Sequence, residues 1–198
     1  ITSNTEPYTV EVTYNDLHSD DHKGTLCIAI PSTVSYNNRA YTVTKIGDYA
    51  FRCSYSITSV EIPSSVTNIG DHAFQSCTSL ISVSIPNTVV TIGSGAFHNC
   101  SSIDSILIPN SVTNIGGSAF EGCSSLKKVI FEGSAPWIEY SFYDVQAEMY
   151  YPADDPTWTE EVITALQAEN ENLTWIPYER DVSETVPTDS EQEQIVTE

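Results

Sequence analysis

Apolar residues recur along this chain with a period of 23 residues. Each repeat carries an isoleucine followed by glycine, and these isoleucines are Ile46, Ile69, Ile92 and Ile115. Each Ile-Gly step leads to an Ala-Phe pair, whose phenylalanines are Phe51, Phe74, Phe97 and Phe120. A short alternating segment then ends at a proline, namely Pro63, Pro86 and Pro109. A fixed period of this length indicates a solenoid, in which each repeat forms one coil.

The alternating segments predict the strands of the coils. Val60, Glu61 and Ile62 alternate apolar with polar and are mostly β-branched, as a half-buried strand requires. The proline after each segment has no N–H group and therefore ends the strand. We expect the shared glycines where φ is positive or where two backbones approach closely, and the Ala-Phe pairs in a short helical or 3₁₀ turn. Because neighbouring coils stack about 4.8 Å apart, the phenylalanines should form one column of stacked rings.

The N-terminal end departs from the repeat. Residues 35–43 are inserted before Ile46, and we interpret them as a β-hairpin that turns at Asn37 and Asn38, which tolerate the left-handed conformation. Upstream of the insertion, residues 8–14 alternate as an additional strand.

The C-terminal end departs from the repeat as well. Residues 157–160 fit a helix capping box, and Trp158, Val162 and Leu166 share one face of the predicted helix. Residues 173–177 are typical of a last strand. Such caps cover the sheet edge and the core that a terminal coil would expose.

These elements together predict an α/β solenoid. It consists of about five 23-residue coils with a parallel β-sheet face, an N-terminal β-hairpin cap and a C-terminal helix-plus-strand cap. We expect residues 1–45 to form the N-terminal β cap with a degenerate first coil, and residues 46–131 to form the regular repeats. Residues 132–178 then form a degenerate coil and the C-terminal cap, and residues 179–198 are an acidic tail or linker.

The charge of the chain excludes some partners. The formal net charge is −20, and Arg180 is the only Lys or Arg after residue 128. Such an acidic surface repels nucleic acid and anionic membranes, and self-repulsion favours a monomer. No stretch approaches the roughly 18 apolar residues of a membrane-spanning helix, so we expect no membrane insertion.

Three of the five cysteines, Cys77, Cys100 and Cys123, recur at the period. They could bind a metal or form disulfides between coils, but a column of small buried thiols is favoured, because parallel side chains rarely give the disulfide torsion. Cys27 and Cys53 lie off the pattern and are the pair to test for a disulfide.

The other candidate chemical groups are histidines and acids. One cluster has the side-chain types of a zinc or nickel site, namely His18, Asp20, Asp21 and His22. It falls in an expected polar loop, so we predict no metal site there. His72 and His98 occupy different repeat positions and are interpreted as exposed polar residues. No catalytic motif occurs, so we predict no catalytic residues, no cofactor and no enzyme activity.

The exposed face of the stacked strands is the candidate binding surface, because solenoids bind through such faces. Alternation directs one column of side chains outward, made of Ser59, Ser82, Ser105 and Lys128. A second outward column consists of Glu61, Ser84, Leu107 and Ile130, in which the last two form a small apolar spot. An alternative aromatic patch near the C-terminal cap contains Tyr140, Tyr143, Tyr150 and Tyr151, which could instead belong to the core of the cap.

The repeat resembles the BspA-like leucine-rich repeats of bacterial surface proteins, whose pattern is Leu-x-x-Val-x-Ile-Pro-x-x-Val-x-x-Ile-Gly-x-x-Ala-Phe-x-x-Cys. The resemblance spans residues 26–178 and is most specific over residues 46–131. It implies a curved leucine-rich-repeat array on a secreted or wall-attached protein of a family associated with adhesion. Cys53, which lies one residue early, and Glu132, which replaces a proline, depart from the pattern. No wall-sorting motif follows, which leaves the means of attachment open.

We therefore expect a non-catalytic binding or adhesion module of a secreted or cell-surface bacterial protein. It would recognise a protein or carbohydrate on host or microbial surfaces. The alternatives are a structural spacer without a ligand of its own and a hydrolase that uses scattered His and acidic residues.

Overall fold

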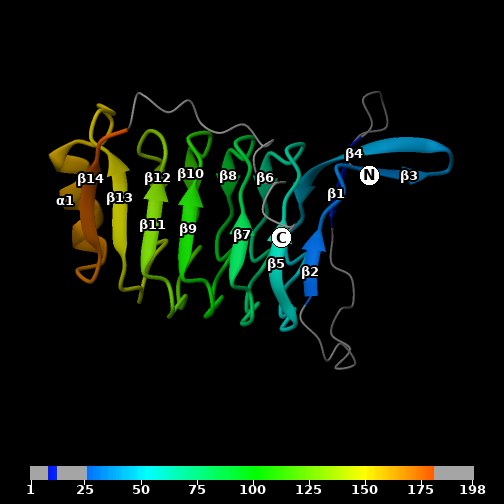
Figure 1. The fold of residues 1–198 in the computed structure, drawn as a ribbon, viewed down its shortest axis with the longest axis horizontal. Helices are drawn as coiled ribbons and strands as arrows, with labels where there is room; N and C mark the ends of the chain where they lie inside the picture. Colours follow the sequence, from blue (N-terminus) through cyan, green and yellow to red (C-terminus); the bar gives the residue numbers. More distant parts are fainter. Residues whose placement is uncertain (1–8, 13–25, 181–198) are drawn as a thin grey trace, which may run out of the picture.

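The computed structural model describes residues 9–12 and 26–180, which form a solenoid with a front wall and a back wall of strands (Figure 1). The front strands are β2 (Leu26–Ala29), β5 (Ile57–Glu61), β7 (Ser82–Ser84), β9 (Ser105–Ile108), β11 (Lys128–Phe131), β13 (Glu148–Pro152) and β14 (Thr174–Tyr178). The back strands are β1 (Thr9–Val12), β4 (Arg39–Ile46), β6 (Asn68–Ile69), β8 (Thr91–Ile92), β10 (Asn114–Ile115) and β12 (Trp137–Ile138). The remaining elements are β3 (Thr33–Tyr36) and the helix α1 (Glu160–Glu169).

The strands pair in parallel from coil to coil, as expected for a solenoid. The back strands form one continuous sheet in the order β1-β4-β6-β8-β10-β12. The front strands form two sheets, β2-β5-β7 and β9-β11-β13-β14, and within residues 26–180 no ladder joins β7 to β9. The sequence predicted only the front wall. The regular back strands contain two residues each, which is too short for an alternating pattern to be visible.

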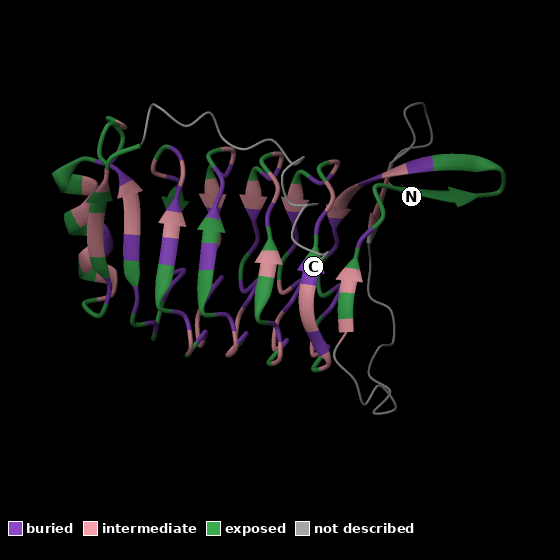
Figure 2. Cartoon of the chain, in the orientation of Figure 1, coloured by how far each residue is buried: buried purple, intermediate pink, exposed green. Residues whose placement is uncertain are grey.

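The core lies between the two walls (Figure 2). The rings of Phe51, Phe74, Phe97 and Phe120 stack on one another, with centroid distances of 5.1 to 5.3 Å and interplanar angles of 10° or less. This arrangement confirms the predicted column. Phe142 extends the column at 5.0 Å from Phe120, one residue short of the regular period, which the sequence pattern did not reveal.

The periodic cysteines form a second buried column. All three are free thiols, and the Sγ atoms of Cys77 and Cys100 donate to the backbone carbonyls of Phe51 and Phe74, each at 3.1 Å. The interpretation as small buried thiols is thereby confirmed. In the first regular coil, buried Ser54 occupies the position that Cys77 holds in the next coil. Cys53 therefore lies one residue before the column.

The Ala-Phe segments form turns closed by bonds from an N–H group to the carbonyl three residues earlier, as in the predicted 3₁₀ turn, and they form no α-helix. In the second regular coil, the N–H groups of His72, Phe74 and Ser76 donate to carbonyls of the following coil at 2.7 to 2.8 Å. His72 and Ser76 have φ of 53° and 60°. The N–H groups between them, those of Ala73, Gln75 and Cys77, donate within the same coil to the carbonyl three residues earlier, at 3.1 to 3.3 Å. Alternate peptide groups therefore bond between coils and within one coil.

The repeated glycines lie where stacked backbones approach each other. Gly70, Gly93 and Gly116 do not have positive φ, and a Cβ atom on Gly93 would lie 2.7 Å from the backbone N of Asp71. The sequence left two roles open for these glycines, positive φ or close approach of two backbones. The structure supports close approach.

The N-terminal cap contains the predicted hairpin. β3 pairs with β4 in antiparallel register from Thr33 opposite Thr42 to Tyr36 opposite Arg39. Asn37 and Asn38 form the turn with φ of 49° and 59°. β1, within the predicted strand 8–14, pairs in parallel with β4; residues 8, 13 and 14 lie outside the described residues.

The predicted helix exists, but its N-cap differs from the predicted one. The hydroxyl of Thr159 caps α1 by accepting a hydrogen bond from Val162 N at 3.2 Å. The predicted capping box at Thr157 was wrong, because the Thr157 hydroxyl is bonded to the carboxylate of Asp155 and accepts from Ala135 N.

The C-terminal cap closes the core with aromatic residues. Trp158 lies just before α1, is buried, and donates its indole N–H to the carbonyl of Gly133 at 2.8 Å. The predicted last strand is confirmed as β14, which pairs in parallel with β13. Trp175 of β14 lies 6.0 Å from the ring of Phe131. The cap therefore supplies apolar surface where another coil would otherwise be needed.

Candidate functional site

The front strands present the predicted outward columns on one face. The ladders align Ser59 with Ser82 and Glu61 with Ser84. They also align Ser105 with Lys128 and Leu107 with Ile130. All eight residues are exposed or half-buried, whereas the alternate positions, such as Val60, Ile106 and Val129, are buried. The predicted orientation of the eight side chains is therefore correct.

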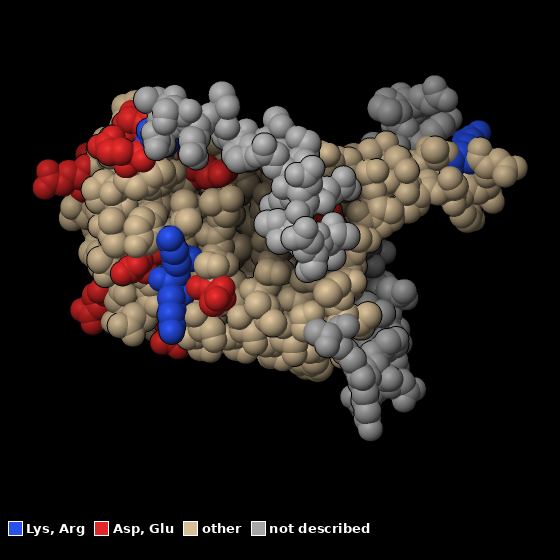
Figure 3. Space-filling model, in the orientation of Figure 1, with Lys and Arg blue, Asp and Glu red and all other residues tan. Residues whose placement is uncertain are grey.

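Charged groups are sparse over the middle of the front face where it is visible, and acidic side chains gather toward the end that carries α1 (Figure 3). A face with few charges on rigid strands suits a neutral ligand that is recognised by hydrogen bonds and apolar contact.

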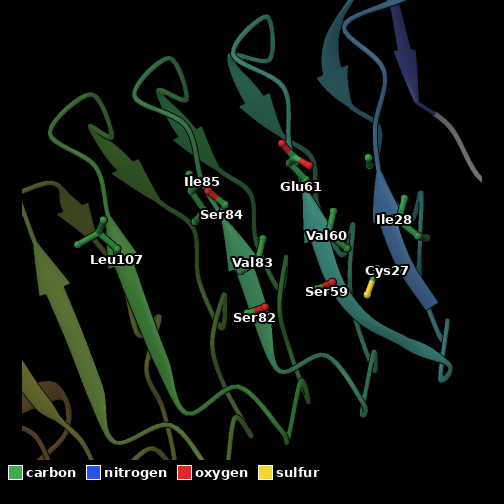
Figure 4. A pocket seen from close by; sticks show the side chains of 11 residues that line it. Cys27, Ile28, Ser59, Val60, Glu61, Ser82, Val83, Ser84, Ile85 and Leu107 are labelled. Atoms are coloured by element: carbon green, nitrogen blue, oxygen red, sulfur yellow. The ribbon is translucent and has the colours of Figure 1, made fainter. Parts of the chain in front are cut away.

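A shallow depression of about 500 Å³ lies on the front face over β2, β5 and β7, and Leu107 of β9 stands at its far side (Figure 4). Five of the eight predicted residues line it: Ser59, Glu61, Ser82, Ser84 and Leu107. It crosses the place where the front ladder is interrupted between β7 and β9. The depression thus combines hydroxyl groups, a single carboxylate and apolar surface.

Cys27 also lines the depression, and sequence reasoning did not include it. The ladder places Cys27 beside Ser59, in the column of outward serines. Hydrogen bonds from Ser59 and Thr58 lower the pKa of the exposed Cys27 thiol. The sequence signal that could have revealed it is the alternation of residues 26–29, which continues the serine column by one strand.

Ser105, Lys128 and Ile130 lie on the same face but do not line the depression. The Lys128 Nζ atom lies 4.8 Å from the ring centroid of Tyr150, within the range of a cation–π interaction. The Tyr150 hydroxyl donates to Glu148 at 2.7 Å, which raises the pKa of that tyrosine. The ladder between β11 and β13 places Tyr150 beside Ile130, so Tyr150 extends the column of Leu107 and Ile130 by one strand.

The four tyrosines near the C-terminal cap do not form one patch. Tyr150 points to the front face, whereas Tyr151, the next residue of β13, packs on Trp158 with a centroid distance of 5.3 Å. Tyr140 and Tyr143 are exposed in the turns of the terminal coil. Of the two interpretations, membership of the cap core applies to Tyr151 alone.

The two histidines of the repeats, His72 and His98, take structural positions. His72 stacks on Tyr49 at 5.1 Å and is half-buried, and half-buried His98 bonds to Gln75 at 3.1 Å. The prediction that both histidines are exposed was therefore wrong. His18, Asp20, Asp21 and His22 lie outside the described residues.

Cys27 and Cys53, the pair to be tested for a disulfide, are both free thiols. Among residues 9–12 and 26–180, no group of three His, Cys, Asp or Glu side chains has the arrangement of a metal site. In the same part of the chain, no helix has the length and apolar character needed to cross a membrane.

Comparisons with known proteins agree with this architecture. Residues 37–149, more than half of the chain, match the family model described as the BspA type leucine rich repeat region, in six copies. A leucine-rich repeat protein from Bacteroides capillosus ATCC 29799 is 32% identical over 63% of this chain and 88% of that chain, with a TM-score of 0.55. No curated protein sequence matches the chain.

Two longer proteins are also similar. The pneumococcal vaccine antigen PcpA is 16% identical over 86% of this chain and 44% of its own, with a TM-score of 0.59, and shares the fold. A leucine rich cell surface protein from Faecalibacterium prausnitzii A2-165 is 29% identical over 76% of this chain and 46% of its own, with a TM-score of 0.49. This chain spans less than half of either protein. Its stacked Ile-Gly and Ala-Phe positions and the six matched repeats place the chain in the BspA-type leucine-rich-repeat family.

Proposed function

We propose that this chain is a non-catalytic binding module of a secreted or cell-surface bacterial protein, and that it recognises a protein or carbohydrate through its front face. The observation that carries the proposal is the depression lined by Ser59, Glu61, Ser82, Ser84 and Leu107. The family resemblance supports the proposed extracellular location and the proposed role in adhesion.

The chemistry of the depression favours binding over catalysis. Glu61 is the single titratable oxygen acid among its lining residues, and its other polar side chains are serine hydroxyls and the Cys27 thiol. Hydroxyl groups both donate and accept hydrogen bonds, so they suit sugar hydroxyls and peptide amides equally. A pair of carboxylic acids for general acid–base catalysis would need a second Asp or Glu, and no other lining residue is one. The net charge of −20 further favours a monomer that binds as a single module.

Arrays of glycans and of host-matrix and bacterial-surface proteins test this proposal with the full chain. We expect a saturable partner whose binding is lost in Leu107→Glu, because a carboxylate at the rim of the depression disrupts apolar contact. Val90→Glu is the matched control, since Val90 is 42% exposed, close to the 45% of Leu107, and lies away from the depression.

Binding that survives Leu107→Glu but is lost in Val90→Glu would contradict the assignment of the front face. The absence of any saturable partner across the arrays would favour the alternative role, a structural spacer without a ligand.

A further inference from the structure

The last coil leaves one edge of the back sheet open. In the regular coils, the carbonyl groups of Ile69 and Ile92 each accept a hydrogen bond from the glycine N–H of the following coil, at 2.9 Å. Ile138 of β12 holds the equivalent position in the last coil, in register with Ile115. Within the described part of the chain, no N–H group donates to the Ile138 carbonyl. β12 is therefore an edge strand whose Ile138 carbonyl can accept a hydrogen bond from an added strand.

A groove of about 530 Å³ runs along this edge, between β12 and α1. Its lining residues are mostly apolar: Ala135, Pro136, Trp137, Ile138, Glu139, Tyr140, Thr157, Val162, Ala165, Leu166 and Glu169. Trp137 and Tyr140 are large aromatic residues that are 68% and 58% exposed. Large aromatic side chains with this exposure are uncommon on surfaces that contact solvent alone and are enriched at interfaces, so Trp137 indicates a contact surface.

The charged groups of the groove are both acidic. Glu139 and Glu169 line it, and Glu169 Oε2 accepts a hydrogen bond from Tyr140 N at 3.0 Å, which holds that carboxylate at the rim. α1 begins with two further glutamates and has no basic residue in its last turn. Arg180, the one basic residue after Lys128, pairs with Asp154 at 2.7 Å and not with the groove.

We propose that this groove binds an extended basic segment of another protein, which adds to the back sheet as a strand beside β12. An extended backbone can donate to the free Ile138 carbonyl, as the next coil would. Lys or Arg side chains on one side of the added strand meet Glu139 and Glu169 and lie over the rings of Trp137 and Tyr140. Alternate apolar side chains contact the floor of the groove.

Two other occupants fit the groove less well. An acidic segment is repelled by both glutamates, and a second copy of this chain brings a net charge of −20 to an acidic surface. The site is separate from the front depression, so the inference does not depend on the proposed function.

Fluorescence anisotropy with a labelled peptide of alternating Arg and Val tests the proposal on the full chain. We expect saturable binding that weakens by about tenfold or more in Trp137→Ala, from the loss of cation–π and apolar contact. Glu139→Gln should weaken it by a smaller factor and reduce its salt dependence. Tyr36→Ala is the matched control, because Tyr36 is also an exposed aromatic residue, at 61%, and lies on the N-terminal hairpin.

Two control peptides separate strand addition from general attraction to acidic surface. A peptide with N-methyl groups at alternate positions keeps the charges but cannot pair with an edge strand, and it should lose the binding. A peptide of alternating Glu and Val should not bind.

Equal binding of the N-methylated peptide, or equal effects of Trp137→Ala and Tyr36→Ala, would overturn the proposal. Concentration-dependent dimerisation in sedimentation experiments that Trp137→Ala abolishes would also overturn it, because the edge would then belong to an interface between copies.

Discussion

The Cys100 thiol donates a hydrogen bond to the backbone carbonyl of Phe74, in the preceding coil, across an Sγ–O distance of 3.1 Å. The same contact joins Cys123 to Phe97 at 3.2 Å. Burial raises the pKa of Cys123 to about 12. A hydrogen bond with Cys77, together with burial, raises the pKa of Cys100 well above its ordinary value. These cysteines therefore link neighbouring coils as neutral thiols.

The first prediction concerns which thiols react in the folded protein. Ellman's reagent at pH 8 should label Cys27 rapidly, because its thiol is exposed and its pKa is lowered by Ser59 and Thr58. Cys77, Cys100 and Cys123 should react only after unfolding in urea. Cys27→Ser should remove the fast phase and leave the urea-dependent phases unchanged. A fast phase that persists in the double variant Cys27→Ser, Cys53→Ser, which also lacks the half-buried Cys53 thiol, would show that a column cysteine is accessible.

The second prediction concerns the phenylalanine column. Phe97 is fully buried and stacks on a ring at each side, so Phe97→Ala leaves a cavity between two coils. We expect a loss of roughly 3 to 5 kcal/mol in the free energy of unfolding, against a typical total of about 5 to 15 kcal/mol. Urea denaturation followed by circular dichroism measures it. Tyr36→Ala, on the exposed hairpin, is the control and should change the free energy of unfolding little; a similar loss in both variants would argue against the stack as the main stabilising feature.

The sequence predicted the features that depend on one coil at a time. Alternation around Val60 predicted the outward direction of Ser59 and Glu61, because neighbouring residues of a strand point to opposite faces. The period itself predicted the stacked rings. Asn37 and Asn38 predicted the hairpin turn through their tolerance of positive φ.

Apart from the stacked rings, which occupy the same position of every repeat, features that depend on contact between coils were not predictable in this way. The back wall depends on two-residue strands such as Thr91–Ile92, whose pairing partners Asn68–Ile69 and Asn114–Ile115 belong to the neighbouring coils. The depression depends on the interrupted ladder between β7 and β9, which no residue pattern marks. The open edge at Ile138 depends on where α1 packs, and helix propensity alone carries no information about that packing.

The third prediction compares two glycines on the same side of the array. A Cβ atom on Gly93 would lie 2.7 Å from the backbone N of Asp71 and from the backbone C of Gly70, so Gly93→Ala forces two coils apart. We expect a loss of about 1 to 3 kcal/mol in the free energy of unfolding, as for other overpacked sites. A Cβ atom on Gly117 would meet nothing closer than 3.4 Å, at the Glu139 carbonyl. Gly117→Ala should therefore be neutral or stabilise by up to about 1 kcal/mol, and equal losses in the two variants would contradict the close-approach explanation.

The fourth prediction follows from the direction of the Cys123 pKa shift. Burial raises its pKa from 9.0 to about 12 in the folded protein, so folding favours the protonated thiol. Below pH 9 both the folded and the unfolded states hold the proton, and the stability is unaffected by this group. Between pH 9 and 12 only the unfolded state loses the proton, so stability falls as pH rises, by up to about 1.4 kcal/mol per pH unit.

Urea denaturation at several pH values between 8 and about 11 measures this loss in the native protein and in Cys123→Ala. The variant should be less stable at pH 8, because the Phe97 carbonyl loses its hydrogen-bond donor. The difference between the two proteins should then shrink as pH rises, since tyrosine and lysine titrations are common to both. Cys27→Ala should not flatten the profile, because Cys27 is exposed and its pKa is lowered. A constant difference between the native protein and Cys123→Ala across this range would mean that Cys123 titrates alike in the folded and unfolded states, and that its burial does not hold the thiol neutral.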